Sequence, residues 1–211
     1  MTQVLLFDVE GTTTAIDFVH KTLFPYSRER MSLFVRSHTE LPVVKNLKAE
    51  FGTIDKVIEV LLGWIATDKK ESRLKELQGL IWEEGYRKGD FQGHVYPDVK
   101  PAFEKWKAEG KTLAIYSSGS VQAPKNIFGY SQAGDLTALL SAYFDTAVGG
   151  KRESSSYRKI AQQLGVSPEQ VTFYSDIKEE LDAAKEAGMK TVQVFRQLAV
   201  QSHGHPGLIA F

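Results

Sequence analysis

Four short apolar runs, separated by stretches with helical periodicity, limit most strongly how this chain can fold. They occupy residues 4–7, 113–116, 171–174 and 192–195. Runs this short and this apolar are typical of strands that are buried on both faces of a parallel sheet. A weaker run near residues 144–148 predicts one further strand.

Helical patterns lie between these runs. Residues 99–109, 157–164 and 177–187 each show such a pattern, and each is followed by a glycine that is suited to end a helix. Strands that alternate with helices in this way predict right-handed βαβ units. We therefore expect an α/β fold built on a doubly wound, Rossmann-like parallel sheet.

One long stretch, from residue 17 to residue 94, contains no convincing strand. Its apolar residues recur at helical spacing, most clearly at Ile54, Val57, Ile58, Leu61, Leu62 and Ile65. We expect a core domain of residues 1–16 and 95–211 and an α-helical cap insertion of residues 17–94. A block inserted there would lie over the carboxyl ends of the strands, where such sheets bind ligands. Residues 197–211 are expected to form an irregular tail.

The composition excludes several classes of function. The 211 residues include no cysteine, which rules out thiolate catalysis and cysteine-ligated metal centres. Lysine and arginine number 26, as do aspartate and glutamate, so no excess of positive charge favours nucleic acid or an anionic membrane. No apolar run approaches the length of a membrane span, and the first residues do not resemble an export signal. We expect a cytoplasmic protein.

Two carboxylates follow the first apolar run. In an extended chain Asp8 and Glu10 point to the same side, about 6–7 Å apart. Their repulsion would be relieved by a divalent cation or a shared proton, or different surroundings would make one a nucleophile and the other an acid. Gly11 would let the chain turn sharply. The simpler interpretation is that Asp8 begins a loop and Glu10 is solvated.

Polar residues also follow the other strands. Ser117 and Ser118 come after the second run, Lys151 follows two glycines after the weak run, and Asp176 comes after the run at 171–174. Each has an ordinary interpretation, as a helix N-cap or a surface turn. Because parallel strands end at one edge of the sheet, these groups together predict a site that handles phosphate.

This order of residues resembles the haloacid dehalogenase (HAD) superfamily of aspartyl phosphatases. More narrowly, it is similar to the acireductone synthase family, the enolase-phosphatases of methionine salvage. Most of the superfamily has aspartate where Glu10 stands, which makes the opening block specific for the narrower family. The segments that carry the likeness are residues 8–14, 18–19, 23–26, 116–121 and 153–160.

The resemblance implies a role for each carboxylate. Asp8 would attack phosphorus, and Glu10 would serve as general acid and base and bind the metal, often through its backbone carbonyl. Asp176 would be a further ligand of one Mg²⁺ per chain, which Asp8 also contacts. Glu180, four residues later, is expected to have only a supporting role.

The remaining site residues would bind the substrate. The resemblance assigns Ser117 and Ser118 to the substrate phosphate, and Lys151 to the nucleophile and the transferred phosphoryl group. The family substrate is 2,3-diketo-5-methylthiopentyl 1-phosphate, which is enolised and then dephosphorylated to the acireductone 1,2-dihydroxy-3-keto-5-methylthiopentene. Four aromatic residues of the insertion, Phe18, Phe24, Trp64 and Trp82, could line an apolar pocket for the methylthio tail, although we expect Trp64 and Trp82 in the core of the cap. The family is expected to be monomeric.

Other functions stay open at this point. The nearest is a HAD phosphatase of another small phosphomonoester, which would use the same residues under a different cap. A phospho-aspartate signalling module also uses Asp, Mg²⁺, a hydroxyl and Lys, but it needs neither Glu10 nor a helical cap. A binding protein without activity would not need all four groups intact. The sequence names no base for enolisation beyond Glu10 by position, His94 is given no role, and His203 and His205 are expected at the surface.

Overall fold

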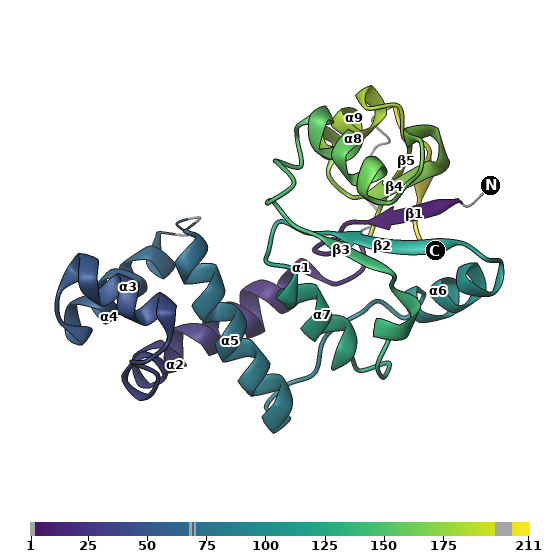
Figure 1. Ribbon diagram of the computed structural model, residues 1–211. Helices are drawn as coiled ribbons and strands as arrows, with labels where there is room; N and C mark the ends of the chain where they lie inside the picture. Colours follow the sequence, from purple (N-terminus) through teal and green to yellow (C-terminus); the bar gives the residue numbers. More distant parts are fainter. Residues whose placement is uncertain (1–2, 68, 70, 197–203) are drawn as a thin grey trace. The chain divides into compact units, whose positions relative to one another are not determined.

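The computed structural model describes residues 3–67, 69, 71–196 and 204–211. The chain divides into two compact units: a helical unit of residues 17–91 and a sheet unit formed by residues 1–16 and 92–211 (Figure 1). Within the described residues, no helix is both long enough and apolar enough to cross a membrane.

The sheet unit is built on a six-stranded parallel sheet with the order β3-β2-β1-β4-β5-β6. The expected α/β fold is confirmed, and each of the four apolar runs forms a strand. The strands are β1 (Val4–Phe7), β2 (Thr112–Tyr116), β3 (Ala142–Phe144), β4 (Val171–Ser175), β5 (Lys190–Val194) and β6 (Gly207–Leu208).

Helices cover both faces of this sheet. Figure 1 shows α8 and α9 on one side of the strands and α6 on the other. The helices of this unit are α6 (Val99–Ala108), α7 (Gln122–Gly129), α8 (Ser154–Gln163) and α9 (Lys178–Glu186), with 3₁₀ turns at Thr137–Leu139 and Pro168–Gln170. The three predicted helices are confirmed, and the glycines after them have positive φ angles.

Side chains of the central strand alternate between the two faces, as the pleat requires. Val4 and Leu6 belong to a buried cluster with residues of α8 and α9. Phe7 points the other way and contacts Phe103, with ring centroids 4.8 Å apart, and Tyr174, at 4.9 Å. Burial on both faces explains why this strand is apolar throughout.

Two predictions about the edges of the sheet need correction. The further strand is confirmed as β3, but it was expected near residues 144–148 and instead ends at Phe144. The chain turns there because the Asp145 carboxylate accepts the N–H of Ala147 at 2.9 Å. The tail was expected to be irregular, but its described part contains β6. The N–H of Phe195, at the end of β5, donates to the Leu208 carbonyl at 2.8 Å.

The helical unit is a bundle with its own core. It contains α1 (Ile16–Phe18, which begins at the last residue of the sheet unit), a π-helical turn (Val19–Leu23), α2 (Phe24–Ser37), α3 (Pro42–Phe51), α4 (Ile54–Ala66) and α5 (Ser72–Lys88). On α4, Val57, Ile58 and Leu61 are buried, as the helical pattern predicts. Trp82 of α5 is also buried, and its indole N–H donates to the Leu23 carbonyl at 2.7 Å.

The central strand is the part of the sheet unit most sensitive to truncation. Leu6 is completely buried, so we expect Leu6→Ala to reduce the free energy of unfolding by about 2–5 kcal/mol. The same substitution at Leu33, which is 72% exposed, should change it by less than about 0.5 kcal/mol. Urea unfolding of both variants measures the difference, and equal stabilities would contradict this description of the core.

Candidate functional site

The sheet brings the predicted carboxylates together at its centre. Asp8 directly follows β1 and Asp176 directly follows β4, and these two strands are neighbours. From β1 the chain continues to β2 on one side and later returns to β4 on the other, so the strand order reverses here. Such a point leaves a crevice at the carboxyl ends of the strands. The Asp8 N–H donates to the Tyr174 carbonyl at 2.9 Å, which extends the pairing to the site.

A tight turn follows Asp8. The N–H groups of residues 12–14 all donate to the Val9 carbonyl, at 2.9 to 3.2 Å. Gly11 has a φ of 81°, and a Cβ atom at this position would overlap the Asp176 carboxylate. Glycine is therefore required both for the backbone conformation and for the close approach of Asp176. Glu10 lies half-buried in this turn.

Lys151 forms ion pairs with two carboxylates. Its ammonium group contacts Asp8 Oδ1 and lies 2.7 Å from Glu180 Oε2. The Lys151 side chain is only 5% exposed. Burial alone would lower the pKa of Lys151, but the charges of Asp8 and Glu180 outweigh it and raise the pKa above its usual value. The lysine therefore stays charged beside Asp8.

Two buried tyrosines fix the loop that carries Lys151. The Tyr116 hydroxyl donates to the Gly149 carbonyl at 2.9 Å, and the Tyr157 hydroxyl donates to the carbonyl of Lys151 itself at 2.6 Å. Burial of the Tyr157 ring raises the pKa of its hydroxyl, so this donor keeps its proton. Although β3 ends well before Lys151, the lysine is held at the site by contacts from β2 and α8.

Thr12 joins the two carboxylates that follow neighbouring strands. Its hydroxyl lies 3.3 Å from Asp8 Oδ2 and 3.2 Å from Asp176 Oδ1, and it accepts the Asp176 N–H at 3.0 Å. Asp176 is not the N-cap of the next helix, because the residue before α9 is Ile177, whose N–H donates to Ser175 Oγ. The Asp176 carboxylate is thus available to the site.

Negative charge exceeds positive charge in this cluster. The Lys151 ammonium pairs with the carboxylates of Asp8 and Glu180, and the Thr12 hydroxyl links a third carboxylate, of Asp176, to Asp8. Burial and the nearby Asp8 charge raise the pKa of Asp176 to about 7, and the same two causes raise the pKa of Glu180 to about 7. Among the described residues, no three acidic or histidine side chains form a complete metal-binding group. A cation here would therefore need backbone oxygens or water as further ligands.

The serines after β2 differ in burial. Ser117 is buried, and its Oγ accepts the N–H of Gly119 at 3.0 Å, whereas Ser118 is exposed. The ordinary interpretation of these serines as helix N-caps is wrong, because α7 begins only at Gln122 and the residue before it is Val121. The loop after β2 therefore presents hydroxyls and backbone N–H groups without a helix terminus.

Sequence reasoning missed several residues of this site. Thr12 was given no role although it is the fifth residue of the motif, and Glu180 was given only a supporting one. Tyr116 and Tyr157 were recognised as parts of a motif, but their contacts with the lysine loop were not. Tyr116 contacts Gly149, which is 33 positions later, and Tyr157 contacts Lys151, which is six positions earlier. For Thr12 and Glu180 the sequence did offer a signal, because each lies four residues after an aspartate of the site, Asp8 and Asp176 respectively.

Two histidines lie elsewhere. His94 accepts the N–H of Ala15 through Nδ1 at 3.0 Å, and burial lowers its pKa. His205 was expected at the surface, which is wrong: it is 4% exposed, and its ring nitrogens lie 2.8 Å from Thr191 Oγ1 and 3.0 Å from Asp182 Oδ1. It is buried because β6 brings this part of the chain onto the sheet. His203 lies outside the described residues.

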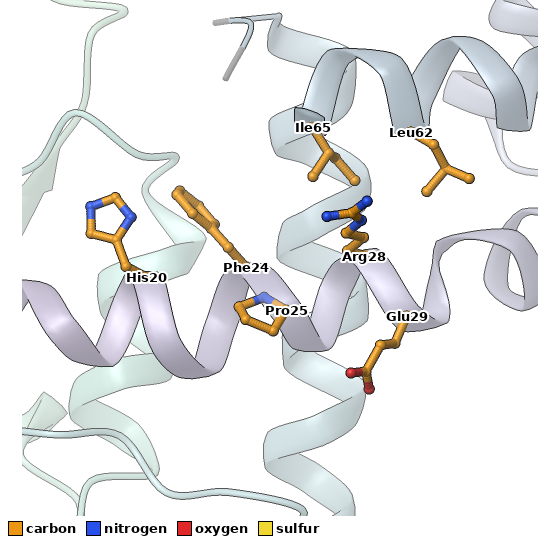
Figure 2. A pocket seen from close by; sticks show the side chains of 7 residues that line it. All are labelled: His20, Phe24, Pro25, Arg28, Glu29, Leu62 and Ile65. Atoms are coloured by element: carbon orange, nitrogen blue, oxygen red, sulfur yellow. The ribbon is translucent and has the colours of Figure 1, made fainter. Parts of the chain in front are cut away.

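The helical unit has a groove of its own, of about 640 Å³. Figure 2 shows Arg28 on one helix pointing toward Ile65 and Leu62 on another, while the Phe24 ring lies on the side of His20. Leu62 and Ile65 complete the helical pattern read from the sequence but are only partly buried. Their partial exposure gives the groove its apolar wall, and the remaining lining residues are His20, Pro25 and Glu29.

The close approach of Gly11 to Asp176 can be tested by its effect on stability. Gly11→Ala should destabilise the protein more than Gly165→Ala, where φ is 69° and the space around an added Cβ is open. Both variants incur the strain of a left-handed alanine, roughly 1–2 kcal/mol, but only the first displaces a carboxylate. Chemical unfolding compares them, and equal losses would show that Asp176 does not require the glycine.

The chain is similar to a known protein family and to individual proteins within it. A family model described as "Hydrolase: haloacid dehalogenase-like hydrolase" matches residues 2–188. The protein "Enolase-phosphatase E1" of Citrobacter koseri is 52% identical over 204 residues, which cover 93% of this chain and 89% of that protein. The protein of the same name from Klebsiella oxytoca is 48% identical over 219 aligned positions, which cover 100% of this chain and 96% of that protein.

Solved structures of related proteins have the same fold as this chain. The UTR4 protein of Saccharomyces cerevisiae superposes with a TM-score of 0.87 at 32% identity, covering 100% of this chain and 99% of that one. A HAD phosphatase from Thermococcus onnurineus shares the fold, with a TM-score of 0.63 at 19% identity and coverage of 100% and 94%. The chain therefore belongs to the haloacid dehalogenase-like hydrolases and, within them, to the enolase-phosphatase E1 (acireductone synthase) family.

Proposed function

We propose that this protein converts 2,3-diketo-5-methylthiopentyl 1-phosphate to the acireductone 1,2-dihydroxy-3-keto-5-methylthiopentene and phosphate, as a step of methionine salvage. The observation that carries the phosphatase half is the placement of Asp8, a carboxylate at the strand switch point that contacts a buried lysine. The relatives named enolase-phosphatase E1 support the choice of substrate.

Asp8 is the proposed nucleophile. One of its carboxylate oxygens attacks phosphorus, the bond from phosphorus to the substrate oxygen breaks, and an aspartyl-phosphate forms. Glu10, in the turn two residues later, is the proposed acid that gives a proton to the leaving oxygen. Glu10 then takes a proton from water, which attacks phosphorus, and phosphate leaves with the Asp8 carboxylate restored.

Lys151 and the loop after β2 would hold the phosphoryl group. Charge spreads over the phosphoryl oxygens during transfer, and fixed positive groups stabilise it without reorganisation. Lys151 is fixed in this sense, because Asp8, Glu180 and the Tyr157 hydrogen bond define its position. Ser117 and Ser118 are the proposed contacts of the phosphate, as the family resemblance implies.

Magnesium suits the oxygen donors at the carboxyl ends of β1 and β4. The Asp8 and Asp176 carboxylates and the Glu10 carbonyl supply oxygen ligands only, which Mg²⁺ prefers, and it would keep water as further ligands. A divalent cation would also relieve the excess of negative charge among Asp8, Asp176, Glu180 and Lys151. When bound, Mg²⁺ would offset the repulsion between Asp8 and the phosphate and polarise a substrate oxygen.

An apolar surface is needed for the methylthio tail. Of the aromatic residues suggested by the sequence, Phe24 lines the open groove of the helical unit, whereas Trp82 is part of that unit's core.

A HAD phosphatase with another small substrate is the second candidate, because the same residues would catalyse phosphoryl transfer. The two are separated by incubating the protein with the diketo phosphate and Mg²⁺ while following phosphate release and the ultraviolet band of a conjugated enol. We expect both signals, and both should stop on chelation. Phosphate release from simple phosphomonoesters without any enol from this substrate would favour the second candidate.

Removal of the nucleophile should abolish turnover. Asp8→Asn keeps the size of the side chain but removes its charge, so phosphate release should fall by at least about 10³-fold. Asp135→Asn is the matched control, since Asp135 is exposed and its carboxylate accepts hydrogen bonds from the backbone N–H and the hydroxyl of Thr137. Circular dichroism checks that both variants fold. Ordinary turnover by Asp8→Asn would rule out Asp8 as the nucleophile.

Metal dependence should change when Asp176 is altered. Asp176→Asn keeps an oxygen near Thr12 but removes a negative charge from the proposed site. The Mg²⁺ concentration for half-maximal activity should then rise by about 10-fold or more. Glu179→Gln, which neutralises an exposed carboxylate on α9, should leave that concentration unchanged. An unaltered Mg²⁺ requirement in Asp176→Asn would show that another group binds the metal.

A further inference from the structure

Arg196, just after β5, connects three distant segments of the sheet unit. Its Nε donates to the Thr12 carbonyl at 2.8 Å, and its Nη1 forms an ion pair with Asp98 Oδ2 at 2.7 Å. The guanidinium lies between two rings, 4.2 Å from the centroid of Tyr96 and 4.8 Å from that of Phe211. The side chain is only 9% exposed, so its position is closely defined.

The first of these contacts reaches the candidate site. The Thr12 carbonyl belongs to the residue whose hydroxyl lies between the Asp8 and Asp176 carboxylates. The adjoining turn is held from within by hydrogen bonds to the Val9 carbonyl. Arg196 binds this turn through a side chain that lies outside it. A shift of Arg196 would therefore move Thr12, whose hydroxyl contacts both carboxylates.

The charge of Arg196 is already compensated. Asp98 pairs with the guanidinium and also accepts the N–H of Phe211 at 2.7 Å. A compensated and buried cation adds little positive potential at Asp8, so its effect on the site is one of geometry. The planar guanidinium can bind Thr12 and Asp98 at once through separate N–H groups, which a lysine ammonium cannot do in the same plane.

We propose that Arg196 is a positioning residue for phosphoryl transfer: by binding the Thr12 carbonyl it holds the turn of residues 9–14 and so sets the separation of Asp8 and Asp176. The effect on turnover rests on the proposed function. The effect on the turn itself does not, and the two are therefore tested separately.

Hydrogen–deuterium exchange tests the turn without any substrate. In Arg196→Lys, the amides of residues 9–14 should exchange about 10-fold faster than in the wild type. Asp98→Asn should have a smaller effect, because Arg196 can still bind Thr12. Met189→Ala is the control for general destabilisation. Met189 is buried and immediately precedes β5, so it lies at the amino ends of the strands, whereas the site lies at their carboxyl ends. Unchanged exchange in Arg196→Lys, or the same increase in Met189→Ala, would overturn the proposal.

Steady-state kinetics test the consequence for catalysis. At a temperature where circular dichroism shows every variant folded, Arg196→Lys should lower kcat about 10- to 100-fold, because small displacements of reacting groups are costly. KM for the diketo phosphate should stay within about 3-fold, and Arg196→Gln should be slower than Arg196→Lys. The double variant Arg196→Gln/Asp98→Asn avoids leaving a lone buried carboxylate and should be as slow as Arg196→Gln.

The two experiments separate the possible failures. If the wild type releases no phosphate, the proposed function fails, while the exchange result still decides whether Arg196 holds the turn. If exchange increases but kcat is unchanged in a folded and active Arg196→Lys, Arg196 stabilises the turn only and its role in catalysis is overturned. Faster exchange together with a lower kcat at constant KM confirms it.

Discussion

The buried ion pair of Lys151 with Asp8 and Glu180 sets conditions that the surrounding structure must meet. A carboxylate and an ammonium removed from water are favourable only with good geometry and further hydrogen bonds. Glu180 supplies a second carboxylate, and Tyr157 fixes the lysine backbone. This arrangement keeps Asp8 beside a positive charge in a cluster whose total charge is negative. A divalent cation is complementary to such a cluster, and when bound it would reduce the repulsion between Asp8 and a phosphate group.

The strand order explains how residues from four parts of the chain reach one place. Reversal of the order between β1 and β4 leaves a crevice where Asp8 and Asp176 follow adjacent strands. Thr12 connects the two carboxylates, and Arg196 connects Thr12 to the far end of the chain. The sheet therefore supplies both the proposed nucleophile and the framework that limits its movement.

The sequence predicted the features that depend on local patterns. Apolar runs identified the central strands, and the positions of Asp8 and Asp176 followed from where two of these runs end. Features that depend on tertiary contacts were not predictable in this way. The end of β3 is set by the Asp145 side chain, β6 exists because the edge of β5 offers it partners, and His205 is buried as a result. The Thr12 hydroxyl is one of many in the sequence until the turn places it between two carboxylates.

The central claim is that Asp8 becomes phosphorylated during turnover. Mixing the protein with substrate and Mg²⁺, quenching in acid within milliseconds and measuring peptide masses tests it most directly. We predict a phosphoryl group on the peptide that contains Asp8, formed and lost at rates that match phosphate release. Release of phosphate with no labelled peptide, or with the label on Glu10 or Asp176 instead, would contradict this account.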